Sequence, residues 1–205
     1  MLIPFRLLAI LVIVLFSSCE KLDRVERRND AGIVVERYSR DPVDSTRSGL
    51  YEAFDDNGLL IERAEYDRDQ LNGERRLYFP SGELQYVETY EGGKYQGPYK
   101  AYYPDGTLQL EGQYVDDVAL GLWTGYYPDG EKKEEVTFAD NAENGPFREW
   151  YSNGAIKAEG NYADGDKEQG ELLLYDLQGK VQKRMYCEAG ICRTVWTAPN
   201  AAANE

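Results

Sequence analysis

The sequence predicts an all-β fold: an elongated, single antiparallel sheet, or meander, built from about six 24-residue β-hairpin repeats. Glycine recurs every 24 residues with one step of 25, and a second glycine follows each of these by nine residues. Aromatic residues occupy fixed places between them, which indicates a repeat architecture. Tyrosine outnumbers phenylalanine by 17 to 6, and this composition suits half-exposed strands better than a large apolar core.

The first residues have the pattern of a secretory signal peptide: Arg6, an apolar run from Leu7 to Phe16, and then small residues. The apolar run is too short to span a bilayer. The segment Phe16-Ser17-Ser18-Cys19 resembles the bacterial lipobox, whose cysteine becomes the first mature residue and is lipidated. We therefore predict a lipoprotein signal peptide at 1–18 and lipid attachment at Cys19. The acyl chains would hold the protein on a membrane of the bacterial cell envelope, with the leaflet left open. An ordinary signal peptide with an incidental cysteine, or a short apolar anchor, is the alternative.

Three segments outside the repeats are predicted from composition. Residues 19–31 mix charges with few apolar residues and are predicted to be a charged tether. Residues 32–48 are predicted to be an N-terminal cap strand and linker, because 32–38 resembles a lone return strand. Residues 197–205 are predicted to be a disordered tail.

Each repeat has the signature of a β-hairpin, and the boundaries are predicted at 49–72, 73–96, 97–120, 121–144, 145–169 and 170–196. In the third repeat a β-prone segment, 99–103, leads into Pro104-Asp105-Gly106, where proline fixes φ and glycine supplies a positive φ. The return strand covers 108–114, and the polar residues 115–120 are predicted to link to the next hairpin. The predicted turn glycines are Gly58, Gly82, Gly106, Gly130, Gly154 and Gly179.

Alternation along the strands separates two faces. Tyr99, Ala101 and Tyr103 share one face, with two large residues around a small one, and we predict that this face is packed. A row of aromatic residues falls on the opposite face and forms a candidate binding ladder. Its members are Phe54, Tyr78, Tyr102, Tyr126, Trp150 and Tyr175. Such a row serves either as structural stacking between hairpins or as a contact surface for a partner.

These patterns resemble the MORN repeat in its bacterial variant form, over about residues 49–186. The matching stretches are GPYKAYYPDGTLQLEGQY, GLWTGYYPDG and GPFREWYSNGAIKAEGNY. The resemblance implies an elongated, twisted antiparallel sheet of successive hairpins. The first repeat departs from the pattern at Asp55-Asp56 and the sixth at Asp176-Leu177, as capping repeats do. Bacterial proteins of this type are often described as antitoxin-like.

Cys187 and Cys192 are the thiols that remain if Cys19 is lipidated. An even number of thiols in an exported chain favours a disulfide, which would close the last hairpin. Free thiols and a redox pair are the alternatives, although no CxxC motif is present.

Composition argues against several function classes. The chain has no histidine, which removes Ser-His and Cys-His catalysis and imidazole metal sites. The net charge of −14 and the lack of basic clusters exclude nucleic acid as a partner. We predict no enzyme activity, no cofactor and no metal, because the acidic segment 164–170 lacks the pattern of a calcium loop. Glu111, Glu135 and Glu159 recur at one repeat position, whereas a carboxylate-based carbohydrate hydrolase needs its pair once.

The sequence therefore favours a non-enzymatic lipoprotein that acts as a protein- or glycan-binding or scaffolding module for an unknown envelope partner. An antitoxin or immunity protein that neutralises a toxin is the alternative, because acidic proteins are steered onto basic ones. A carbohydrate hydrolase is the third hypothesis.

Overall fold

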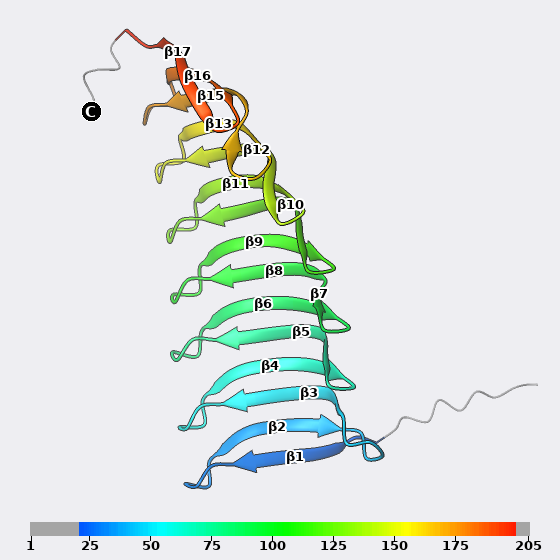
Figure 1. Ribbon diagram of the computed structural model, residues 1–205. Helices are drawn as coiled ribbons and strands as arrows, with labels where there is room; N and C mark the ends of the chain where they lie inside the picture. The colour runs from blue at the N-terminus through cyan, green and yellow to red at the C-terminus, as the bar shows by residue number, and fades with distance from the viewer. Residues whose placement is uncertain (1–20, 200–205) are drawn as a thin grey trace, which may run out of the picture.

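The computed structural model describes residues 21–199, and the regular elements of this part of the chain are all strands. They form one unclosed antiparallel sheet of 17 strands, in which each strand pairs with strands close to it in the sequence. Figure 1 shows them stacked in chain order. This arrangement confirms the predicted fold class. The strands are β1 (Asp23–Arg28), β2 (Val34–Arg40), β3 (Arg47–Phe54), β4 (Leu60–Asp67), β5 (Gln70–Tyr78), β6 (Leu84–Glu91), β7 (Lys94–Tyr95), β8 (Gly97–Tyr102), β9 (Leu108–Val115), β10 (Val118–Tyr126), β11 (Lys132–Ala139), β12 (Ala142–Trp150), β13 (Ile156–Ala163), β14 (Lys167–Glu168), β15 (Gly170–Tyr175), β16 (Val181–Glu188) and β17 (Ile191–Thr197).

Five-residue turns join the two strands of each predicted hairpin, and these turns lie along one side of the sheet, at the ends of the strands. In the turn between β8 and β9, the Tyr103 amide donates to the Thr107 carbonyl at 2.8 Å and the Gly106 amide donates to the Tyr103 carbonyl at 2.9 Å. Gly106 has a φ of 86°, in the left-handed region that favours glycine. The other five predicted turn glycines occupy the same position, with φ between 76° and 89°.

The segment predicted as a charged tether contains a strand. Residues 23–28 form β1, which pairs with β2 and makes an additional hairpin around a turn at Gly32. Cross-strand ion pairs stabilise it: Arg27 Nε lies 2.8 Å from Glu36 Oε2, and Arg37 Nε lies 3.2 Å from Glu26 Oε1. The charges that suggested a solvated tether are therefore paired across the sheet.

The segments predicted as polar linkers are two-residue turns along the other edge. Asp116 and Asp117 have φ of 50° and 68°, so β9 runs to Val115 and β10 begins at Val118. Positive φ at both central residues is the signature of a type I′ hairpin turn, whose twist matches that of the flanking strands. Asp140-Asn141 makes the same turn in the next repeat.

These two-residue turns are hydrogen-bonded from one repeat to the next. Asp117 donates its amide to the Tyr95 carbonyl at 3.0 Å and accepts the Tyr95 amide on Oδ1 at 2.8 Å. The Asp116 amide donates to Gln96 Oε1 at 2.9 Å. At the opposite edge, the Tyr103 hydroxyl donates to the Tyr126 carbonyl at 2.8 Å. Hydrogen bonds at the turns on both sides of the sheet therefore fix the spacing of neighbouring hairpins.

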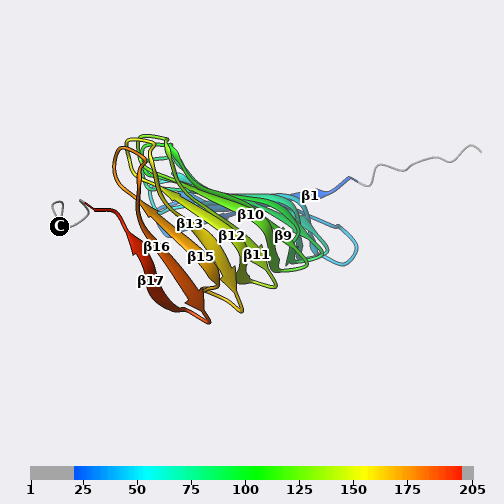
Figure 2. The same ribbon diagram turned by 90° about the horizontal axis from the view of Figure 1, so that it is seen from above.

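The core lies on one face of the sheet, the one predicted to be packed. Seen from above, the strands change direction gradually along the stack (Figure 2), as expected for a twisted sheet. Trp123, Phe147 and Tyr90 are buried on this face beside small residues. The small buried residues are Ala53, Ala64, Ala101, Ala119 and Ala158.

Candidate binding surface

A continuous cluster of aromatic rings crosses the packed side of the sheet, which we call the aromatic face. Ring centroids lie 4.5 Å apart for Tyr90–Tyr95, 4.9 Å for Tyr95–Tyr114, 5.2 Å for Tyr114–Trp123 and 5.7 Å for Trp123–Phe138. Within residues 21–199, no second layer packs on this face, because all the regular elements are strands of this one sheet. The cluster is therefore supported from below by the sheet and is open above.

One cross-strand row explains where the aromatic face is hollowed. In this row an aromatic residue of each return strand faces a variable residue of the next strand: Tyr90 faces Tyr95, Tyr114 faces Ala119 and Phe138 faces Glu143. Tyr95 fills the space between the rings on either side of it. One repeat later the methyl group of Ala119 is too small to fill the corresponding space between Tyr114 and Phe138, and a hollow of about 250 Å³ remains.

This cavity, the Ala119 hollow, has an apolar floor and an acidic rim. Trp123 and Val136 line its floor and Tyr114 and Phe138 its sides, while Glu134 and Glu143 reach it from β11 and β12. Glu143 is half-buried, and its pKa is raised by burial and then by the carboxylates of Asp166 and Glu134. Apolar rings and carboxylates thus share one small space.

Two further hollows lie along the same face. One of about 270 Å³ precedes the Ala119 hollow and is lined by Tyr86, Tyr99 and Tyr103. The other, of about 320 Å³, follows it and is lined by Phe147 and Tyr162, whose rings stack at 4.2 Å. The aromatic face is therefore a series of shallow depressions at about the period of the repeat.

The buried carboxylate of this face, Glu88, has hydrogen-bond or ion-pair partners on both of its oxygens. Glu88, with 5% of its surface exposed, accepts hydrogen bonds from the Tyr90 hydroxyl at 3.0 Å and the Tyr95 hydroxyl at 3.1 Å. Arg75 Nη1 lies 3.1 Å from Glu88 Oε2, the oxygen that also accepts from Tyr90. Burial is the main cause of the raised pKa of the Tyr90 hydroxyl. Because all of its partners belong to the sheet, Glu88 has a structural role.

The six residues of the candidate binding ladder lie half-buried on the opposite face, which we call the ladder face. Two of their hydroxyls meet carboxylates: Tyr126 donates to Glu111 at 2.7 Å, and Tyr175 donates to Glu159. Arg37 lies over the Phe54 ring, with Cζ 5.3 Å from the centroid. The ring pairs found in the described residues join side chains of the aromatic face. Ladder rings therefore contact charged groups rather than one another.

The recurring glutamates belong to a cross-strand row of charges on the ladder face. Glu111 is paired in register with Lys100 and Thr124, and Glu159 is paired with Arg148. Arg148 Nη2 lies 3.3 Å from Glu159 Oε2. These glutamates are held by cations of neighbouring strands along an open sheet, which is a surface arrangement and gives no support to a pair of catalytic carboxylates.

Four segments of the chain match the MORN repeat variant, at residues 71–91, 95–116, 119–140 and 143–164. Each match covers one five-residue turn with its two strands, and the hairpins on either side, outside these matches, have the same geometry. The Ala119 hollow lies where the second, third and fourth MORN-like segments meet. No curated protein matches the chain.

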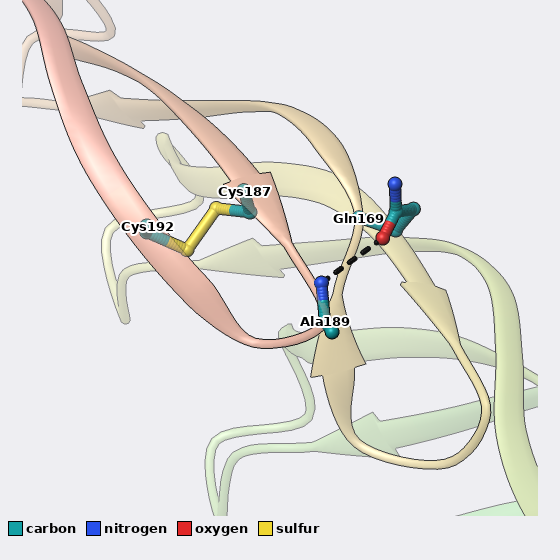
Figure 3. The surroundings of a disulfide bond; sticks show 4 residues. All are labelled: Gln169, Cys187, Ala189 and Cys192. Atoms are coloured by element: carbon teal, nitrogen blue, oxygen red, sulfur yellow. Dashed lines mark hydrogen bonds between the residues drawn. A yellow bond between two sulfur atoms is a disulfide. The ribbon is translucent and has the colours of Figure 1, made fainter.

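Cys187 and Cys192 face each other in β16 and β17 and form a disulfide, with their Cα atoms 4.0 Å apart (Figure 3). The turn between these strands is held by the Ala189 amide, which donates to Gln169 Oε1 at 3.1 Å. Cys19 and the signal segment 1–18 lie outside the described residues, as do 200–205.

The described chain contains no helix that could cross a membrane. Residues 21–199 also contain no group of three or more His, Cys, Asp or Glu side chains placed to hold a metal ion.

Proposed function

We propose that the chain is a non-enzymatic binding module of a bacterial cell envelope, held there by lipid on Cys19, and that the aromatic face binds a protein partner. The single observation that carries this proposal is the open ring cluster from Tyr90 to Phe138. Tyr95, Tyr114 and Phe138 of this cluster are partly exposed. Aromatic side chains give rigid contact points at protein interfaces, and repeat sheets supply long surfaces of this kind.

The charge on this face favours a protein over a glycan. Glu134, Glu143 and Glu149 border the hollows, and the chain has a net charge of −14. Neutral sugars could stack on the rings and donate hydrogen bonds to these carboxylates, but only a basic protein surface would add attraction between opposite charges.

Site-specific photo-crosslinking in intact cells tests which face binds. A photoreactive amino acid replaces Lys157, an exposed residue that lines a hollow of the aromatic face, or Lys100 on the ladder face. Gln109, a second position on the aromatic face, is tested as well, because a single photoreactive residue can point away from the partner. We expect a crosslinked protein from the aromatic-face positions only. Crosslinks from Lys100 alone would place binding at the ladder, and crosslinks to saccharide alone would overturn the protein assignment.

The lipid anchor is tested separately. Cys19→Ser should abolish incorporation of labelled fatty acid and release the chain from sedimented membranes. Ser18→Ala, which leaves the cysteine in place, is the matched control. A Cys19→Ser protein that still sediments with membranes would contradict the lipidation and leave the apolar segment as the anchor.

An antitoxin or immunity role is a second candidate, because an acidic binding face suits a basic toxin. A small basic exported protein encoded beside this chain, toxic only when this chain is deleted, would support it. Deletion without harm, in cells that produce such a neighbour, would count against it.

A further inference from the structure

The Ala119 hollow combines the two features that proteins use to recognise organic cations. Aromatic faces attract a cation through the ring quadrupole, and carboxylates pair with it directly. Here Tyr114, Trp123 and Phe138 supply the rings, and Glu134 and Glu143 supply the carboxylates. A side chain with an apolar stem and a charged end would contact both parts.

We infer that the Ala119 hollow receives a lysine or arginine side chain of the protein that binds the aromatic face. This inference rests on the proposed function and adds the chemistry of the contact. The stem of the basic side chain packs against Trp123 and Phe138, as long cationic side chains do on apolar surface, and its charged end lies between the two glutamates.

The charges around the hollow leave one carboxylate without a counter-ion. Among residues 21–199, no hydrogen bond or ion pair engages the Glu143 side chain, and its charged neighbours are Asp166 and Glu134. Glu134 has one cation nearby, Lys133, whose Nζ lies 3.6 Å away with both side chains 40% or more exposed. Such an exposed pair contributes little, so an entering cation meets net negative charge.

The chain itself shows a lysine in the equivalent setting one repeat further on. There Lys157 lines the hollow formed by Phe147 and Tyr162, with its Nζ 2.7 Å from Glu149 Oε2. One repeat earlier, Tyr95 fills the corresponding space with its ring. The next hollow also contains a carboxylate, Glu168, so the Ala119 hollow differs from it in having no lysine among its lining residues.

A second group in the hollow lacks a partner. Trp123 is 7% exposed, and its indole Nε1 is buried without a hydrogen-bond acceptor in the described chain. An unpaired buried donor is costly. This donor is buried, so a backbone carbonyl oxygen of a bound peptide would accept from it only after the indole shifts, which the resonance of this N–H would report.

Binding to the full-length protein in non-ionic detergent tests the inference. The probe is a hexalysine peptide, and the readout is the indole N–H resonance of Trp123, assigned with Trp150→Phe and Trp196→Phe. We expect hexalysine to shift this resonance and Glu134→Gln/Glu143→Gln to weaken binding about tenfold. The control, Glu131→Gln/Glu171→Gln, removes the same charge from exposed positions and should stay within about twofold.

A filled hollow provides the second variant. Ala119→Tyr places at this position the residue that its neighbour repeat has, so the sheet should fold while hexalysine binding falls at least about tenfold. Equal weakening in the two glutamate pairs would reduce the effect to net charge and overturn the inference. A chitohexaose probe that shifts Trp123 in the Glu134→Gln/Glu143→Gln protein, but not in Ala119→Tyr, would make the hollow a glycan site and also overturn it.

The crosslinking experiment distinguishes a failure of the inference about the Ala119 hollow from a failure of the proposed function. Partner crosslinks from the aromatic face that persist in Ala119→Tyr would show that the face binds a protein without using the hollow. Loss of crosslinks in Ala119→Tyr and in Glu134→Gln/Glu143→Gln, with the control pair unaffected, supports both. Absence of any aromatic-face crosslink in the wild type would remove the proposed function first.

Discussion

The indole of Trp123 lies directly against Gly112, so closely that a Cβ built on this glycine would come 2.1 Å from the nearest ring atom. Gly112 has no positive φ, and its role is therefore to make room for the ring and not to permit a special backbone conformation. The floor of the Ala119 hollow depends on this contact.

Gly112→Ala should displace Trp123 and lower the free energy of unfolding by about 2 kcal/mol, as overpacking does. Gly125→Ala is the matched control, because the Cβ would there meet Glu134, whose flexible carboxylate end can turn away. We expect the control to change stability by less than about 1 kcal/mol. Urea unfolding followed by tryptophan fluorescence measures both, and equal losses would show that Trp123 is not held by Gly112.

The hydrogen bond from the Tyr127 hydroxyl to the Trp150 carbonyl, 2.8 Å long, joins consecutive repeats. Tyr127→Phe should cost about 1 kcal/mol of unfolding free energy. Phe79 occupies the same repeat position without a hydroxyl, so Phe79→Tyr should gain up to about 1 kcal/mol by reaching the next repeat. Tyr102→Phe, on the ladder face, is a control for loss of a tyrosine hydroxyl. A destabilised Phe79→Tyr protein would contradict the equivalence of the two positions.

Reduction of the Cys187–Cys192 disulfide should loosen the end of the sheet. The loop that it closes is short, so the expected loss is about 2 kcal/mol in the chain-entropy view. Hydrogen exchange should rise in β16 and β17 and stay unchanged in β8 and β9, because the contacts of each strand are made mainly with strands close to it in the sheet. A Cys187→Ala/Cys192→Ala protein should behave like the reduced one. Faster exchange throughout the sheet would mean that the last hairpin limits the stability of the whole array.

Alkaline pH should destabilise the fold through its tyrosines. Burial raises the pKa of Tyr51 and of Tyr126 from 10.0 to about 12, with Glu36 and Glu111 adding to it. Above pH 10 the unfolded chain therefore loses these protons before the folded chain does, so stability is complete below about pH 10 and falls as pH rises toward about 12. Denaturant unfolding across this range measures the fall.

The Tyr126 hydroxyl gives a site-specific check on that prediction. Glu111→Gln should lower the pKa of Tyr126, because it removes the negative charge that accepts a hydrogen bond from the protonated hydroxyl. Ultraviolet titration against the Tyr126→Phe difference spectrum measures this pKa. A Tyr126 pKa that stays near 12 in Glu111→Gln would mean that burial alone sets it.

The parts of the fold that could be predicted from sequence are those fixed by neighbouring residues. Pro104-Asp105-Gly106 fixes its turn locally, and the period of the glycines places that turn six times. The residues Asp116-Asp117 also form a tight turn, but without glycine the sequence does not favour positive φ. A hydrogen bond from the Tyr95 amide and another to the Gln96 side chain stabilise it.

Strand β1 and the Ala119 hollow were missed for a related reason. Asp23–Arg28 has no alternation of apolar residues, and its strand conformation depends on ion pairs with β2. The hollow follows from Ala119 standing where the previous repeat has Tyr95. That difference is visible in the aligned repeats, but its meaning requires the cross-strand row that brings Tyr114 and Phe138 to either side.

Pairing between sequence neighbours also bears on how the chain acquires its shape. Each strand finds its partner a short distance away along the chain, and the hydroxyl of Tyr103 reaches across only one repeat. Low sequence separation of contacts goes with rapid folding, and a linear array can begin at any hairpin. Under the export that we propose, a chain that crosses a membrane in an extended state can form its sheet hairpin by hairpin as it emerges, without waiting for its far end.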